Sequence, residues 1–178
     1  MRVFAYCAKS YERMTRRAAG VEPLTCPPVW TLNFDSRRLE GHDFLYFDLH
    51  GQPGEPQWYG DGARVALTED QINRADLSGA VVFATSCWLG DEDSPMLDAL
   101  LDAGAEYVIG GPGENYAYAS VLLGAGLLAL WFRRLYALGL PVLTALALAK
   151  KRLNYGRGKR TYAAMDAREF KAYWRPEE

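Results

Sequence analysis

Two apolar stretches, each carrying a reactive side chain at its end, constrain the fold of this chain more than any other feature. Asp43–Gly51 reads DFLYFDLHG and Ala80–Gly90 reads AVVFATSCWLG. Bulky and β-branched residues fill successive positions of both stretches, a pattern typical of strands that helices cover on both faces of a parallel sheet. One of these strands delivers His50 and the other delivers Cys87, which points to cysteine-nucleophile chemistry.

The rest of the chain alternates strand patterns with helix patterns. Further strands are predicted at Arg2–Ala8, Val29–Phe34 and Ala105–Gly111. Helical periodicity, helix caps and glycine stops predict the helices Lys9–Ala19, Glu69–Asp76, Met96–Ala103, Asn115–Leu138 and Val142–Asn154. This alternation is typical of an α/β three-layer sandwich, in which a mostly parallel sheet has helices on both faces.

Three segments do not fit a central strand or a long helix. Val21–Pro28 carries three prolines, which exclude a central strand and a helix interior there. Gln52–Gly62 is rich in glycine and proline and is interpreted as an excursion or small hairpin over the sheet edge. Tyr155–Glu178 is polar and is expected to pack as an irregular or short helical tail. Because no linker or repeat divides the chain, residues 1–178 are interpreted as one domain.

The composition argues against several kinds of function. A formal net charge of −2 gives no general attraction to nucleic acid or to an anionic membrane. Three cysteines without a CxxC pair, together with two histidines, argue against a disulfide framework and a zinc site. The N-terminus lacks the apolar core of a signal peptide, and the uncharged run Asn115–Phe132 is interpreted as a buried helix rather than a membrane span. We therefore expect a cytoplasmic protein without metal or cofactor.

The spacing of the histidine and the cysteine suits two neighbouring strands. His50 and Cys87 are separated by 37 residues (87 − 50), an interval that holds a loop, one predicted helix and one predicted strand. Crossovers of this kind place two parallel strands beside or near each other, and neighbouring strands lie about 4.8 Å apart. Since ligands of open α/β sheets bind at the carboxyl ends of the strands, the thiol, the imidazole and a cleft are expected to meet at that edge.

A thiol beside an imidazole predicts a defined chemistry. His50 is expected to act as a base for Cys87 or as an acid for the leaving amine. The backbone amides of Gly51 and Cys87 are expected to form an oxyanion hole, and the missing side chain of Gly51 to let a substrate carbonyl approach closely. The alternative is structural, because a cysteine at the end of a buried strand is commonly an inert small hydrophobe and His-Gly is a common strand-to-turn ending.

The chain resembles the caspase-like cysteine peptidases, and within them most closely the CHAT family. Three motifs occur in the order typical of that family: DFLYFDLHG, VVFATSCWLG and LLDAGAEYVIGG. The apolar helical sequence that follows is similar to the family's C-terminal half, so the resemblance runs from Asp43 to Leu153. It implies a caspase-like fold and a cysteine endopeptidase that cleaves peptide bonds through a Cys87–His50 dyad and a thioester acyl-enzyme. It also implies a protein or peptide substrate and a regulatory protein partner.

Residues that follow the predicted strands are candidates for substrate recognition. The candidate substrate-binding residues are Trp88, Asp91 and Glu114. An acidic pocket formed there would favour an arginine or lysine of the substrate, because a buried carboxylate gains most from a paired cation. The alternative is that Asp91–Asp93 caps and charges a helix N-terminus. Conversely, three arginines that follow the first strand would favour an acidic substrate residue: Arg13, Arg16 and Arg17.

Two other functions stay open. The first is a catalytically silent caspase-like interaction or scaffold module. Its support is the pair Ser86 and Trp88 around the thiol, where CHAT proteins commonly have alanine before the cysteine and glutamate after it. The second is a hydrolase or transferase that uses a serine, for which the chain lacks a G-x-S-x-G elbow.

Overall fold

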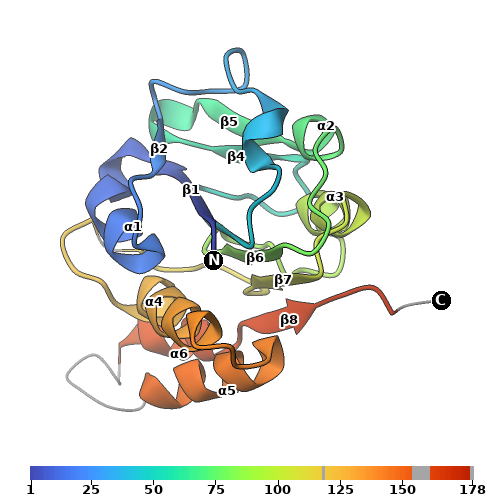
Figure 1. Ribbon diagram of the computed structural model, residues 1–178. Coiled ribbons are helices and arrows are strands. Elements are labelled where there is room, and N and C mark those ends of the chain that lie inside the picture. Colours follow the sequence, from blue (N-terminus) through green and yellow to red (C-terminus); the bar gives the residue numbers. More distant parts are fainter. Residues whose placement is uncertain (118, 154–160, 177–178) are drawn as a thin grey trace.

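A six-stranded sheet with the strand order β2-β1-β3-β6-β7-β8 forms the centre of the computed structural model (Figure 1). The structure describes residues 1–117, 119–153 and 161–176. Neighbouring strands run parallel, apart from β8, which is antiparallel to β7. The strands of this sheet are β1 (Val3–Ala8), β2 (Leu24–Cys26), β3 (Phe44–Asp48), β6 (Val81–Ala84), β7 (Tyr107–Gly110) and β8 (Lys171–Tyr173).

Helices cover both faces of the sheet, so the predicted α/β three-layer sandwich is confirmed. One apolar core lies between the sheet and the helices α1 (Glu12–Ala19), α4 (Gly124–Ala137), α5 (Val142–Arg152) and α6 (Tyr162–Arg168). The second core lies under α2 (Glu69–Ile72), α3 (Pro95–Asp102) and a hairpin of β4 (Gln57–Tyr59) and β5 (Val65–Thr68). Figure 1 shows α4, α5 and α6 gathered on one side of the sheet and the hairpin on the other.

Strand β3 shows why its sequence is apolar on both faces. All five of its residues are buried. Phe44 and Tyr46 belong to the core under α1 and α4, whereas Leu45 and Phe47 belong to the core on the hairpin side. Successive side chains of a strand point to opposite faces, so a strand between two cores has no solvent-facing positions to fill with polar residues.

The two helix starts that were predicted from capping residues are confirmed. The Thr68 hydroxyl accepts a hydrogen bond from the Gln71 amide, and the two residues form a complete capping box at the start of α2. Ser94 caps α3, and Pro95 is its first residue. Helix α2 ends at Ile72 rather than at the predicted Asp76. The Asp76 carboxylate instead accepts a hydrogen bond from the Ser78 amide, a local turn that competes with helix.

The strand predicted at Val29–Phe34 is wrong. The amides of Asn33 and Phe34 both donate to the carbonyl of Trp30, which folds this segment into turns. The strand that borders β1 is instead β2, inside the proline-rich segment. It is the edge strand of the sheet, a place that tolerates prolines because one row of backbone N–H groups has no ladder to complete.

The helix predicted at Asn115–Leu138 begins only at Gly124. Asn115 is held elsewhere, because its amide N–H binds the Cys87 sulfur and its side-chain amide donates to the Ser86 carbonyl. The tail predicted at Tyr155–Glu178 as irregular or a short helix contains a short helix, but it also contains a strand that was not predicted. Residues 154–160 and 177–178 lie outside the described residues, but the remainder forms α6 and β8 and completes the sheet. Within it, Phe170 is fully buried and stacks on Phe83, with 5.6 Å between ring centroids.

In the described part of the chain, no helix has both the length and the apolar character needed to cross a membrane.

Candidate active site

The register of two neighbouring parallel strands brings His50 and Cys87 to the same edge of the sheet. Strands β3 and β6 are hydrogen-bonded neighbours, and Phe47 is the register partner of Ala84. His50 is three residues beyond Phe47 (50 − 47), and Cys87 is three residues beyond Ala84 (87 − 84). The pairing extends past the strands, since the Thr85 amide donates to the Phe47 carbonyl at 2.8 Å. The expected crossover is confirmed, and both residues lie just beyond the carboxyl ends of their strands rather than within them.

The backbone of His50 is fixed, while its side chain is exposed. Its N–H donates to the Tyr59 carbonyl and its carbonyl accepts from the Tyr59 N–H, both at 2.8 Å. The imidazole packs beside the ring of Tyr11, with 5.3 Å between ring centroids. It also borders an open depression of about 290 Å³ that is lined by Tyr59, Asp61 and the glycines between and beside them. His50 therefore has a defined backbone position and a side chain that a bound peptide can reach.

Gly51 is required by the backbone of the cysteine loop. A Cβ atom at this position would overlap the carbonyl oxygen of Cys87. A substrate carbonyl was expected to approach Gly51 closely, but the group that does so is the carbonyl of Cys87. Within the described residues, the N–H groups of Gly51 and Cys87 donate no hydrogen bond to another residue. Two adjacent N–H groups without acceptors are the type of donor that an oxyanion hole needs.

The Cys87 thiol is half-buried and contacts the loop that follows β7. The amide N–H of Asn115 donates to Sγ at 3.2 Å, and Sγ lies 3.7 Å from the Asn115 carbonyl oxygen. Burial raises the pKa of the thiol, and the negative charges of Glu114 and Asp48 raise it further, while the Asn115 N–H opposes them. In the ligand-free protein, these surroundings favour the neutral thiol over the thiolate.

Trp88 adopts a backbone conformation that is unusual for its residue type. Its φ angle is 63°, in the left-handed region that favours glycine. The conformation is held by a hydrogen bond of 2.9 Å from the Trp88 N–H to the Gly113 carbonyl. Backbone strain of this kind costs on the order of 1–3 kcal/mol and collects at functional sites. The loop after β7 therefore contacts both Trp88 and the thiol next to it.

The two acidic candidates differ in position. Glu114 lines an open depression of about 370 Å³ together with Asp166 and Glu169. The Asp91 carboxylate accepts a hydrogen bond from the Glu92 amide. The residues that follow Asp91 border a separate depression at the start of α3: Glu92, Asp93, Asp98 and Asp102. Glu92 and Asp93 therefore border the start of α3, but the residue that caps this helix is Ser94 and the acid in its first turn is Asp98.

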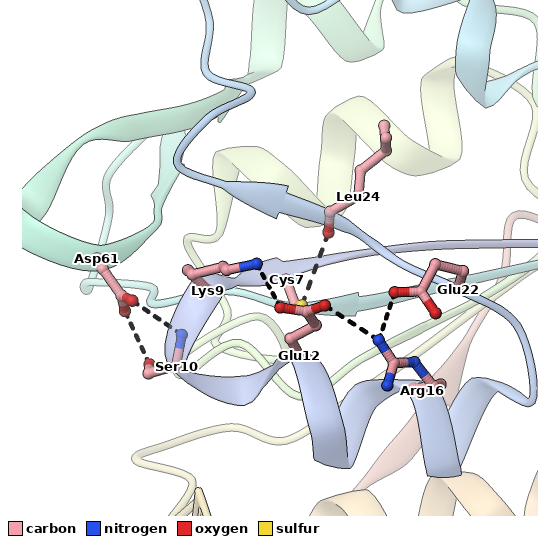
Figure 2. Close-up of polar contacts among 8 residues, drawn as sticks. All are labelled: Cys7, Lys9, Ser10, Glu12, Arg16, Glu22, Leu24 and Asp61. Atoms are coloured by element: carbon pink, nitrogen blue, oxygen red, sulfur yellow. Dashed lines mark hydrogen bonds and ion pairs between the residues drawn. The ribbon is translucent and has the colours of Figure 1, made fainter.

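One of the three arginines that follow β1 is held in ion pairs with neighbouring acids. Figure 2 shows Arg16 between two carboxylates, Glu12 and Glu22, with which it forms ion pairs. Lys9 also pairs with Glu12. Because Arg16 is paired with these acids, it is not available to bind an acidic substrate residue. This weakens the alternative of a cleft lined by Arg13, Arg16 and Arg17. In the same view, Asp61 accepts hydrogen bonds from the backbone and hydroxyl of Ser10, which ties the start of this helical segment to the loop beside His50.

The sequence analysis missed one residue, Asp48. Its carboxylate is 7% exposed and accepts hydrogen bonds from the hydroxyls of Thr15 and Thr85, each at 2.7 Å. Burial raises the pKa of Asp48, and the two hydroxyls and the nearby charge of His50 oppose that rise. A signal was present in the sequence: an acidic residue stands at the end of an otherwise apolar buried strand, two positions before the histidine.

Among the described residues, no cluster of three or more His, Cys, Asp or Glu side chains has the arrangement of a metal site. Cys7 and Cys26 are buried and free of disulfides.

Comparison with known proteins gives information on the fold. No family model matches the chain, and no curated protein matches it. Two crystal structures of the separase–securin complex of Saccharomyces cerevisiae are similar to it, with TM-scores of 0.58 and 0.55 and sequence identities of 13% and 12%. The similarity covers 97% of this chain but 12% of that chain. The fold is caspase-like. At this level of identity the likeness concerns the fold alone.

Proposed function

We propose that this chain is a cysteine endopeptidase in which Cys87 is the nucleophile and His50 transfers the proton, and that it is related to the CHAT family. The observation that carries the proposal is the pairing of Phe47 with Ala84, which puts an imidazole and a thiol three residues beyond the same rung of a parallel ladder. The caspase-like fold and the resemblance of the three strand motifs support the same reaction class.

The proposed reaction has two stages. His50 accepts the thiol proton of Cys87, and Sγ attacks the carbonyl carbon of the scissile amide. The oxyanion that forms accepts hydrogen bonds from the N–H groups of Gly51 and Cys87. When it collapses, the C–N bond breaks and His50 gives the proton to the leaving amine. Water then attacks the thioester with His50 as base, which releases the acid and returns the proton to the thiol.

Substrate contacts are proposed on both sides of the thiol. Glu114 and the loop that carries it border one depression, and the hairpin loop beside His50 borders another. Trp88, half-buried next to the nucleophile, is proposed to contact the substrate backbone. Asp91 stays a prediction. We further propose a regulatory protein partner; the separase of the similar structures is bound to securin.

Cleavage of a positional peptide library tests the proposal. Wild-type protein is expected to cleave a subset of the peptides, and Cys87→Ala and His50→Ala to lower the rate by more than about 10³-fold. His42→Ala is the matched control, because His42 lies before β3, at the opposite end of the strand from His50. Cleavage that survives Cys87→Ala would refute the assignment of the nucleophile.

A silent interaction module is the second candidate. The raised pKa of Cys87 favours it, because burial and the charge of Glu114 stabilise the resting thiol. A peptide with an electrophilic end group separates the two candidates by mass spectrometry of the labelled protein. A peptidase gains one probe per chain at Cys87, and a silent module gains none there.

A further inference from the structure

Asp48 is a buried acid without a cationic partner. Its two hydrogen-bond donors, Thr15 and Thr85, are neutral hydroxyls. No lysine, arginine or histidine nitrogen of the described residues lies within ion-pair distance of it. Burying a carboxylate without a countercharge is costly, and such groups are normally paired, bound to metal or protonated. An ionised carboxylate offers about four lone-pair positions, so two remain for a ligand.

The acid lies in the wall of a small cavity next to the residue that contacts the nucleophile. Polar lining comes from Tyr11, Asp48, Thr85 and Asn115, and Asn115 is the residue whose N–H binds Cys87 Sγ. The other walls are mostly apolar side chains from α1 and from the segment before α4, among them Met14, Val121 and Leu122. The volume of this cavity is about 20 Å³, which is room for about one water molecule.

A buried hydroxyl lies behind Asp48 in the same strand. The hydroxyl of Tyr46 is fully buried and makes no well-formed hydrogen bond among the described residues, although the Thr85 side chain lies near enough to oppose the rise of its pKa. It lies 3.8 Å from the Cβ position of Gly126, a residue that lines the cavity. Tyr46 precedes Asp48 by two positions, so both side chains point to the same face of the sheet. A hydroxyl without a well-formed hydrogen bond, next to a buried carboxylate, indicates that a further polar group belongs in this space.

We propose that this cavity is the specificity pocket of the enzyme, and that Asp48 binds the arginine or lysine side chain of the substrate residue whose carbonyl Cys87 attacks. The inference rests on the proposed function for the role of Cys87. The aliphatic stem of either side chain packs against the apolar walls, while its charged end reaches Asp48. Hydrogen bonds between opposite charges are about twice as strong as neutral ones, and an acidic substrate residue would meet a like charge.

The pocket must widen to admit such a side chain. Its cover is formed by residues 115–117 and 119–123, which lie in no helix or strand and expose Tyr116 to 53% and Val121 to 43%. Because the described residues of this cover belong to no helix or strand, we expect the cover to be the part of the wall that shifts. A shift of Asn115 also changes its N–H contact with Cys87 Sγ, a contact that lowers the pKa of the thiol.

Occupancy of the pocket is coupled to the nucleophile through charge. Asp48 is one of the groups that raise the pKa of Cys87. A bound cation offsets that negative charge, so the thiolate fraction increases when the correct side chain is in place. A basic substrate would thereby help to activate the residue that attacks it.

Binding to a protein without the thiol tests the pocket independently of catalysis. Acetylated peptide amides that differ only in arginine, lysine, citrulline or norleucine at one position are titrated into Cys87→Ala by calorimetry. Arginine and lysine peptides are expected to bind at least about 10-fold more tightly than the citrulline peptide, a neutral isostere. Asp48→Asn in the same background should remove that preference and leave the affinity of the citrulline peptide within about 2-fold.

The control is Asp70→Asn, a charge-matched change in α2 on the opposite face of the sheet. It should keep the preference for arginine. Equal affinities for arginine and citrulline peptides in Cys87→Ala would overturn the inference, as would an arginine preference that persists in Asp48→Asn. If Cys87→Ala prefers arginine while the wild type cleaves no peptide, the pocket stands and the peptidase assignment fails. If the wild type cleaves peptides without regard to charge, the assignment stands and the pocket fails.

Discussion

Acidic side chains occupy two contrasting regions near the carboxyl edge of the sheet. At the start of α3, Glu92 and Asp93 share an open depression with Asp98 and Asp102, where water and salt weaken each charge. On the other face of the sheet, Asp48 stands alone and 7% exposed between two threonine hydroxyls. The numerous acids are the obvious candidates in the sequence. The single buried acid has the stronger field, because little solvent screens it.

The largest expected difference between the two regions is in the specificity of cleavage. Asp48→Asn should lower kcat/KM for arginine substrates by about 10- to 100-fold, since a buried hydrogen bond to a charged group contributes about 1.5–3 kcal/mol. Cleavage of citrulline substrates should change little. Asp93→Asn should change either rate by less than about 2-fold. Steady-state kinetics on the matched peptides checks this, and equal losses for arginine and citrulline would mean that Asp48 acts on the dyad rather than on the substrate.

The second difference concerns the reactivity of the thiol. Because burial and the charges of Glu114 and Asp48 raise the pKa of Cys87, alkylation by iodoacetamide should increase as the pH rises into the alkaline range. Removing the negative charge in Asp48→Asn lowers the pKa of the thiol and shifts the alkylation profile to lower pH. Asp93→Asn should leave the profile in place. An unchanged profile in Asp48→Asn would show that the carboxyl is neutral in the folded protein over the tested range.

The smallest difference is expected in stability. The folded-state pKa of Asp48 is raised above the value of about 3.9 in an unfolded chain, so the folded protein binds this proton more tightly. The stability that comes from this protonation is fully present below the unfolded pKa and is lost as the pH rises through the folded pKa. Asp48→Asn should therefore gain stability relative to wild type between pH 4 and pH 7, measured by urea unfolding. Asp93→Asn should stay within about 0.5 kcal/mol of wild type at both pH values.

Much of the fold followed from local patterns. The apolar runs around Phe44 and Val81 predicted two buried strands, and Thr68 and Ser94 predicted helix starts that the structure confirms. These features depend on periodicity and on hydrogen bonds that reach three residues along the chain. The strand predicted from Val29 to Phe34 was wrong because its apolar residues pack around turns rather than within a ladder.

The placement of His50 and Cys87 followed partly from the sequence and partly from the register. Spacing predicted that their strands are neighbours, which the structure confirms. It did not predict that Gly51 would pack on the Cys87 carbonyl, or that Asn115 would bind the thiol from 28 residues away. Whether the dyad is active stays a prediction, tested by the variants of the two residues.

The sequence by itself determined which segments are buried, where several helices begin, and that a thiol and an imidazole follow buried strands. Those properties depend on side chains within one turn or one strand. Only the tertiary structure decided the surroundings of Asp48, whose partners Thr15 and Thr85 lie 33 and 37 residues away, and the sixth strand near Phe170. The physical reason is that the charge of a carboxylate depends on the solvent and donors around it, and distant parts of the chain supply both.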